Sequence, residues 1–220
     1  MKRFIYHSLS LVAIAGLFIA VWPAGQTAYG YWSQRTLRTE WDAAAKNQAA
    51  PKSQTAATTP GPKAAHRQIT TAPAPKPVAA KPKQRHLATW PPTRLVIPEQ
   101  NLDVVVVQGT ESWNLQHGPG HEVTSAGPGQ EGNCVILGHR NICGSWFYNL
   151  DQLVPGAEVR LVTTRHTYTY HITTVTSVSE SDTSVLQAGT GVSRLTLITC
   201  TSPHSTSRIV VIADLYQTDE

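Results

Sequence analysis

The C-terminal part of the chain is predicted to be an all-β domain, either a barrel or a sandwich. Seven or so runs rich in Val, Ile, Thr and Tyr lie between residues 90 and 220, with Gly and Pro turns between them. The N-terminal part differs, because one apolar run is followed by a long stretch of Ala, Pro, Thr and Lys. We therefore expect one β-domain behind an anchor and a tether.

The β-domain is expected to begin at residue 90 and to run to residue 220. Its strands are predicted at residues 94–98, 102–108, 133–139, 157–164, 167–179, 194–200 and 208–215. A helical turn is expected at 111–116 and a short helix at 145–153, which ends before Pro155 and Gly156. We detect no internal repeats.

A membrane anchor is predicted at the N-terminus. Residues 1–3 are a short basic start, and residues 4–22 form an apolar run of about nineteen residues interrupted only by His7, Ser8 and Ser10. A helix of that length crosses a hydrocarbon core of about 30 Å, and its basic end stays in the cytoplasm. A cleaved signal peptide is the alternative. The run is longer than the apolar core of most signal peptides, and no clear cleavage site follows it, so we favour the anchor.

Two segments separate the anchor from the β-domain. Residues 23–45 form a juxtamembrane segment with two open alternatives: its aromatic residues lie at the outer membrane interface, or a continuing helix uses them for packing. Residues 46–89 have almost no large apolar side chains, and we expect a disordered Ala/Pro/Lys-rich linker. A flexible chain of that length has a root-mean-square span of roughly 35–40 Å, so the tether lets the domain work away from the membrane.

The positive charge of the chain lies in the linker. Residues 46–85 hold eight Lys or Arg and no acid, whereas residues from 87 onward hold six Arg, no Lys and twelve Asp or Glu. A nucleic-acid-binding domain carries its positive charge on the folded part, so this function is disfavoured. A basic unfolded segment suits an anionic membrane or an envelope polymer, or is merely a solvated linker.

Three cysteines exclude a disulfide-rich miniprotein, and none of them forms a C-x-x-C pair that would indicate zinc. Cys134 and Cys143 are either bonded to each other or free. Cys200 ends an apolar strand and opens onto a loop, where stiff β-branched neighbours can aim a nucleophilic thiol. Taken alone, a cysteine at such a position is more often a buried core residue, since free cysteine is among the most buried residue types.

A thiol nucleophile needs a base or a cation nearby. His139 is the better-placed histidine, because it also ends an apolar strand, and two strand ends can meet at one rim of a barrel. His204, in the loop after Cys200, is the alternative. Arg208 begins the last strand and can either donate hydrogen bonds to an oxyanion or pair with a surface acid such as Asp182.

Three segments together carry a family resemblance: residues 196–200 (TLITC), 137–140 (LGHR) and 208–211 (RIVV). Together with residues 94–98 and 115–121 they resemble the sortases, cysteine transpeptidases that attach secreted proteins to bacterial envelopes, and most of all the class D and E branches. The resemblance implies an eight-stranded β-barrel. It also implies that Cys200 is the nucleophile, His139 the acid/base partner and Arg208 the oxyanion or substrate-positioning group.

The resemblance further implies partners and a location. The substrates are secreted proteins with a C-terminal LPxTG-like sorting signal, and the acceptor is an amine of a peptidoglycan precursor or of a pilin. The protein would be a single-pass protein of the bacterial cell membrane with its catalytic domain outside. We also expect Leu137, Ile198 and Thr199 to contribute to substrate binding.

We expect no cofactor. Some sortases bind calcium through a carboxylate cluster, but Glu180 and Asp182 do not make a convincing one, so no metal is predicted. Two other functions remain open: a thiol hydrolase acting on the same motif, in which water replaces the amine, and a non-catalytic envelope-binding β-domain.

Overall fold

The computed structural model describes residues 2–49, 90–187, 191–203 and 205–220, and in the N-terminal helix it describes side chains only for Trp22 and residues 25–48. The linker predicted over 46–89 therefore lies outside the described residues from residue 50 on. The helices are α1 (Lys2–Ala49) and α2 (Ser112–Leu115), and the 3-10 turns are η1 (Pro98–Gln100), η2 (Leu150–Gln152) and η3 (Ser184–Leu186). The strands are β1 (Thr93–Ile97), β2 (Leu102–Gln108), β3 (Gly120–His121), β4 (Gly132–Leu137), β5 (Glu158–Thr163), β6 (Thr167–Ser179), β7 (Ser193–Cys200) and β8 (Ser207–Asp219).

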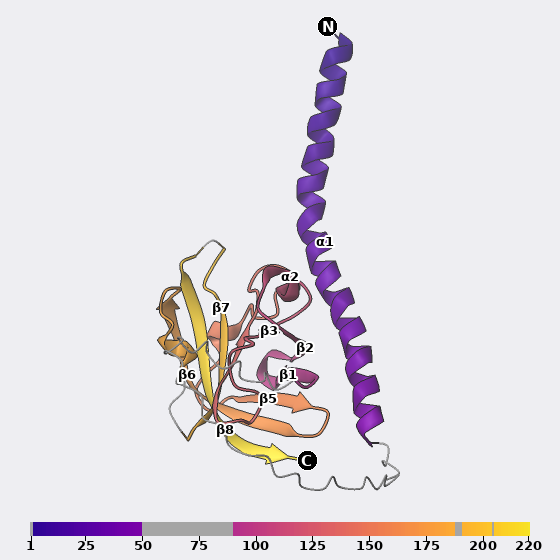
Figure 1. The fold of residues 1–220 in the computed structure, drawn as a ribbon. Coiled ribbons are helices and arrows are strands. Elements are labelled where there is room, and N and C mark those ends of the chain that lie inside the picture. The colour runs from indigo at the N-terminus through magenta and orange to yellow at the C-terminus, as the bar shows by residue number, and fades with distance from the viewer. Residues whose placement is uncertain (1, 50–89, 188–190, 204) are drawn as a thin grey trace, which may run out of the picture.

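The eight strands close into one barrel in the order β1-β2-β3-β4-β7-β8-β6-β5. Figure 1 shows this barrel beside the long α1. Most neighbouring strands are antiparallel, whereas β2 pairs with β3 and β4 pairs with β7 in parallel. The predicted all-β domain and the eight-stranded barrel implied by the resemblance are confirmed.

The core follows from the alternation of side chains along the strands. In β1 and β5 every second residue is buried, so that Leu95, Ile97, Val159 and Leu161 point into the barrel. The parallel strands β4 and β7 differ, because both of their faces are covered and their apolar runs are nearly continuous. On their outer face a second cluster contains Val135, Ile198 and Val210, against which Leu137, Val178, Val185 and Ile212 pack.

Three details of the secondary structure differ from the sequence-based expectation. No helix forms over residues 145–153; the segment consists of turns and η2, and its apolar spacing arises because the loop inserts Phe147 and Leu150 into the core. Strand β3 was not predicted, because two residues are too short to show an alternating pattern. Strand β8 runs on to Asp219, because the equally long β6 pairs with it along its whole length.

Helix α1 spans residues 23–45, where a helix was one of the expected options, and continues on either side of them. Within the side chains that the structure describes, no helix has the length and hydropathy needed to cross a membrane. Of the residues predicted to form the anchor, 4–22, the structure describes the side chain of Trp22 alone. The predicted anchor is therefore not covered by this finding.

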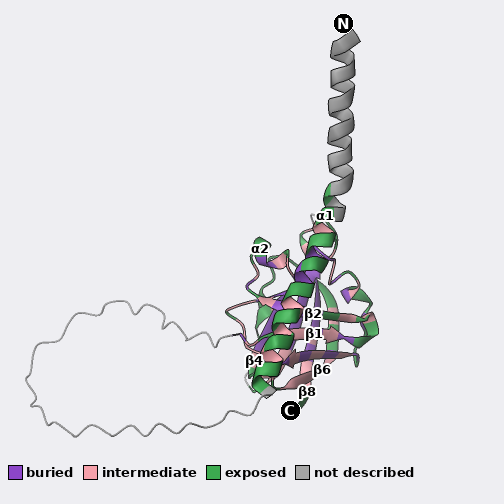
Figure 2. Ribbon diagram, turned by 90° about the vertical axis from the view of Figure 1, so that its right-hand side faces the viewer, coloured by how far each residue is buried: buried purple, intermediate pink, exposed green. Residues whose placement is uncertain are grey.

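The C-terminal half of α1 packs against the barrel, as Figure 2 shows. Gln34 is buried there, and its amide pairs with the backbone of β2: Oε1 accepts from the Val105 N–H at 2.8 Å, and Nε2 donates to the Val105 carbonyl at 2.9 Å. The same Nε2 also donates to the carbonyl of His117 at 2.9 Å. Val105 needs such a partner, because β3 covers β2 only at Val107 and Gln108. Gln34 thus takes the place of a missing strand neighbour.

Candidate active site

The register of two parallel strands brings the predicted nucleophile and base to one end of the barrel. Leu137 of β4 lies opposite Ile198 of β7. The pairing continues one step beyond, because the Gly138 N–H donates to the Ile198 carbonyl at 3.0 Å. His139 and Cys200 each lie two positions beyond the last paired residues, so the two strands lead them to the same end of the barrel although 61 positions separate them.

Cys200 is half-buried at the end of β7, and its thiol is free. Its cross-strand neighbour in β8 is Arg208. The three predicted catalytic residues therefore stand at the ends of three adjacent strands, β4, β7 and β8, at the same rim of the barrel. Cys200 and Arg208 lie eight positions apart in one hairpin, whereas only the parallel pairing of β4 with β7 brings the distant His139 to the same rim.

His139 is half-buried, and burial lowers the pKa of its imidazole. Among the described residues, none forms a hydrogen bond with the ring, and no carboxylate opposes the effect of burial. The ring is therefore held in its neutral form at neutral pH. A neutral imidazole can accept a proton, which is the property a general base needs.

The loop after His139 folds back on itself and fixes the backbone of that residue. The Phe147 N–H donates to the His139 carbonyl at 3.2 Å. The fully buried Phe147 ring lies against Gly138, where an added Cβ would come within 2.6 Å of the ring. Gly138 must therefore lack a side chain for the loop to close. Further along, Arg140 forms an ion pair with Asp151 at 2.9 Å.

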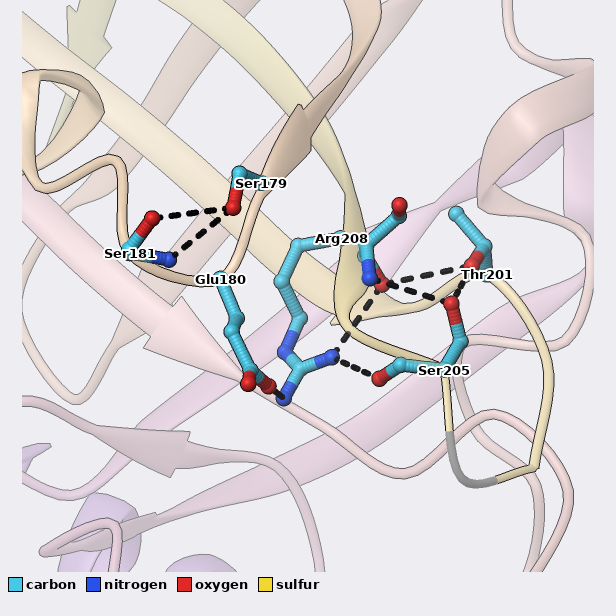
Figure 3. A network of polar contacts seen from close by, with 7 residues as sticks. Ser179, Glu180, Ser181, Thr201, Ser205 and Arg208 are labelled. Atoms are coloured by element: carbon cyan, nitrogen blue, oxygen red, sulfur yellow. Dashed lines mark hydrogen bonds and ion pairs between the residues drawn. The ribbon is translucent and has the colours of Figure 1, made fainter.

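Arg208 is held by several acceptors (Figure 3). Its Nη1 donates to the carbonyls of Ser205 and Ser207 at 2.7 and 3.1 Å, and its Nη2 donates to Glu180 at 2.8 Å. Glu180 follows directly after β6, and its own N–H donates to the Thr206 carbonyl. We expected either an oxyanion donor or a pairing with a surface acid such as Asp182. The structure shows the pairing, with Glu180 as the acid.

The loop between Cys200 and Arg208 is tied together by hydroxyl groups. The hydroxyls of Thr201 and Ser205 are 2.5 Å apart, and the Thr201 N–H donates to the Ser207 carbonyl at 3.2 Å. His204, the alternative base, lies outside the described residues. Asp182 accepts hydrogen bonds from the N–H and hydroxyl of Ser184. The two carboxylates considered for calcium thus bind different partners.

Comparison with protein families decides the identity of this barrel. A family model described as the sortase domain matches residues 95–216. The chain belongs to the sortase family. The matched residues include β4, β7 and most of β8, so Cys200, His139 and Arg208 lie within the sortase domain.

Individual relatives agree with this assignment. Sortase A of Streptococcus agalactiae is 30% identical over 131 residues, which cover 57% of this chain and 53% of the relative. Sortase D of Bacillus subtilis is 32% identical over 106 residues, 48% of this chain and 52% of the relative. The chain thus spans about half the length of the curated relatives it matches.

Solved structures show the same fold. Sortase E of Streptomyces avermitilis aligns with a TM-score of 0.55 and 30% identity, covering 59% of this chain and 90% of that one. Sortase D5 of Clostridium perfringens aligns with a TM-score of 0.54 and 31% identity, covering 58% and 79%. A sortase A structure from Listeria monocytogenes aligns equally well, at 0.54. The class D or E branch therefore stays a prediction.

Three residues predicted to bind substrate lie just before the predicted catalytic positions of this sortase domain. Ile198 is buried in the outer apolar cluster, and Leu137 is partly buried against it. Thr199 is 2% exposed, and its hydroxyl donates to the Gly138 carbonyl at 2.8 Å. This contact favours a positioning role for Thr199, because it ties the end of β7 to the end of β4. Substrate binding by Leu137 and Ile198 stays a prediction.

The other two cysteines of the sortase domain are free and buried. Cys134 faces the core from β4, and burial raises the pKa of its thiol strongly. Burial also raises the pKa of Cys143, in the loop after His139. Of the two alternatives considered for this pair, the structure shows the free thiols. Neither has the exposed position that a nucleophile needs.

Two parts of this site could hardly be predicted from the sequence. Glu180 was considered only as a metal ligand, and its pairing with Arg208 joins residues 28 positions apart. The contact between α1 and the loop after His139 was not foreseen at all. Gly30 packs on the backbone of Cys143, where an added Cβ would come within 2.9 Å, and Tyr31 packs edge-on against Trp146 at 4.9 Å. The glycine was the one available signal, because Gly in a helix interior often marks a close approach.

Proposed function

We propose that this protein is a membrane-anchored cysteine transpeptidase that cleaves an LPxTG-like sorting signal and transfers the acyl group to an amine. The observation that carries the proposal is the position of the half-exposed Cys200 beside His139 and opposite Arg208 at one rim of the barrel. The substrates would be secreted proteins with the signal at their C-terminus. The acceptor would be an amine of a peptidoglycan precursor or of a pilin.

The reaction needs one proton carrier and one nucleophile. His139, held neutral by its burial, accepts the proton of the Cys200 thiol as Sγ attacks the carbonyl carbon of the threonine. The tetrahedral intermediate then collapses, the C–N bond breaks, and His139 gives the proton to the departing amine. The acceptor amine attacks the resulting thioester, forms a new amide bond and releases the Cys200 thiol.

In this scheme Arg208 stabilises the oxyanion or positions the substrate. Its guanidinium is already fixed by Glu180 and by two carbonyls, so it is preorganised. A fixed cation next to the nucleophile loses little entropy when the oxyanion forms. This role makes the side chain of Arg208 matter for catalysis independently of its bond to Glu180.

A pair of substitutions separates the two roles of Arg208. We expect Arg208→Ala to lower kcat/KM by at least about 10²-fold, since one oxyanion donor is lost. Glu180→Gln keeps a hydrogen-bond acceptor for Arg208 and should change kcat/KM by less than about 10-fold. Steady-state kinetics on a fluorogenic sorting peptide measures both. Equal losses in the two variants would show that Arg208 acts only by holding the loop between β7 and β8.

The proposed reaction is tested by product analysis with the full chain in detergent. A panel of LPxTG-type peptides is incubated with and without an added amine, and the products are identified by mass spectrometry. We expect a ligated product with the amine and slow hydrolysis or an accumulated thioacyl enzyme without it. The same hydrolysed product under both conditions would favour the thiol hydrolase, and no cleavage across the panel would favour a non-catalytic β-domain.

The location follows the same proposal. We expect residues 4–22 to anchor the chain as a single span, with residues 1–3 in the cytoplasm and the barrel outside. The charge of the segment supports this orientation, because the basic residues Lys2 and Arg3 precede the apolar run. Protease protection in sealed membrane vesicles checks it.

A further inference from the structure

Helix α1 contacts the barrel along its whole C-terminal half. Near the end of the helix, Gln48 Oε1 accepts hydrogen bonds from Thr164 and Arg165 in the turn between β5 and β6, at 2.8 and 3.2 Å. In the middle, Arg38 pairs with Asp103 at 2.7 Å. Asp103 also binds Arg94, whose guanidinium lies 4.7 Å from the centre of the Trp41 ring.

Residues 30–34 of α1 contact the barrel at the end that carries Cys200 and His139. The Ser33 hydroxyl is 2.8 Å from Nδ1 of His117, and Gln34 pairs with Val105. Gly30 and Tyr31 reach the loop that follows His139. The helix also packs closely on the segment before β3, because a Cβ at Gly118 would lie 2.2 Å from Nε2 of Gln34.

The two ends of the docked helix therefore mark the two ends of the barrel. Gln48 lies at the β5–β6 turn, where Thr167 pairs with Asp219 near the C-terminus. Gly30 lies at the His139 loop, eighteen residues or about 27 Å of helix away. Figure 1 shows the same direction: α1 leaves the barrel past α2 and the β7–β8 loop on its way to the N-terminus.

We infer that α1 holds the active-site end of the barrel against the membrane surface. The inference rests on the proposed anchor at residues 4–22. Because α1 is one helix, Gly30 stands only eight residues, or about 12 Å, beyond the end of that anchor. The headgroup layer is about 5–7 Å thick on each side of the hydrocarbon core, so the catalytic rim lies just outside it.

Exposed apolar side chains at this end support the inference. Trp113 of α2 is 65% exposed, and Ile142 in the loop after His139 is 47% exposed. Trp22, at the end of the anchor, is 64% exposed. Tryptophan is enriched where proteins meet the headgroup region, because its ring is amphipathic. The side of the barrel that faces the anchor thus offers side chains that suit a lipid surface.

With α1 docked in this way, the linker does not determine how far the barrel stands from the membrane. Residues 50–89 connect Ala49 to Trp90, and both ends of that connection lie at the far end of the barrel: Gln48 and Trp90 line one cavity of about 810 Å³ together with Thr163 and Thr164. A chain that starts and finishes at the same end does not set the height of the domain. The height is set by the docked helix, and the catalytic rim is presented to molecules held at the bilayer surface.

Energy transfer to labelled lipids tests the orientation. The full chain, in a Cys200→Ala background, carries one dye at Ser202→Cys or at Thr218→Cys and is reconstituted into phosphatidylcholine vesicles that contain a headgroup-labelled acceptor lipid. Both positions are exposed, and they lie at the active-site end and the far end of the barrel. Since the docked helix is about 27 Å long between the two ends of the barrel, we expect transfer from position 202 to be at least about twofold more efficient.

A matched pair of variants shows whether docking causes the difference. Gly30→Leu with Gln34→Ala wedges α1 from the barrel and removes its main hydrogen bonds, so the two efficiencies should converge. Gly25→Leu with Arg35→Ala is the control, because a side chain at Gly25 meets nothing within 4 Å and Arg35 is exposed. Circular dichroism checks that both barrels are folded.

The outcomes are distinct. Equal transfer from both positions in the parent chain, or stronger transfer from position 218, overturns the orientation. A difference that persists in the wedged variant overturns docking as its cause. Failure of the parent chain to float with the vesicles would instead overturn the proposed anchor, and the peptide assay above still reports the catalytic activity in that case.

Discussion

Replacing Cys200 by alanine is expected to abolish cleavage of sorting peptides, with a loss of at least about 10³-fold in kcat/KM. The reason is that every step of the proposed reaction passes through a bond to Sγ. No other thiol can substitute, because Cys134 and Cys143 are buried and burial raises the pKa of each. Peptide cleavage followed by chromatography measures the rate. Mass spectrometry on the parent protein, with amine omitted, should show an acyl adduct on the peptide that contains Cys200.

Cys143→Ala is the matched control for this substitution. Cys143 lies in the loop after His139 and is 4% exposed, so its removal tests whether any thiol near the site is sufficient. We expect activity within about threefold of the parent, because a buried thiol with a raised pKa supplies no thiolate. Retained cleavage by Cys200→Ala, or an adduct located on Cys143, would show that the nucleophile has been assigned to the wrong residue.

Replacing His139 by alanine is expected to lower kcat/KM by at least about 10²-fold, since a general acid and base is lost. The pH dependence of kcat/KM in the parent enzyme should also report the pKa of His139. Its neutral form carries the activity, so activity falls as the pH drops through the pKa of His139. Burial lowers that pKa, which places the acid limb of kcat/KM below the ordinary value of about 6.5. The pH profile of kcat/KM between about 4.5 and 8 checks the direction.

His204→Ala is the comparison for His139, because His204 lies in the loop after Cys200 and was the alternative base. Its activity and its acid limb should match those of the parent. A large loss in His204→Ala together with a small loss in His139→Ala would reverse the assignment. An acid limb above pH 6.5 in the parent would show that burial does not dominate the titration of His139.

The strands were the part of the fold that could be predicted best. Strands β2 and β6 have the same bounds as the runs read from the sequence, because β-branched residues alternate in them or form continuous apolar runs. The segment 145–153 was misread as a helix, since Phe147 and Leu150 have helical spacing although they are loop residues inserted into the core. Spacing reports which side chains are buried, and it does not report which backbone buries them.

Some residues of the candidate site could likewise be predicted from the sequence, whereas their partners could not. Cys200 and His139 could be selected from the sequence, because each follows an apolar strand and each carries reactive chemistry. The partner of Arg208 could not be selected, since Glu180 and Asp182 have the same charge and lie two positions apart. The structure separates them: the carboxylate of Glu180 binds Arg208, whereas that of Asp182 caps the turn at Ser184.

The sequence by itself determined the residue types that end the strands, the position of the apolar N-terminal run and the membership of the β-domain in its class. These follow from local patterns of side chains. Only the tertiary structure decided that His139 and Cys200 are neighbours, that Glu180 holds Arg208, and that Gln34 completes the open edge of β2. Each of these contacts joins residues 28 to 71 positions apart. Such contacts exist only once the barrel has closed and α1 has docked, so no local pattern encodes them.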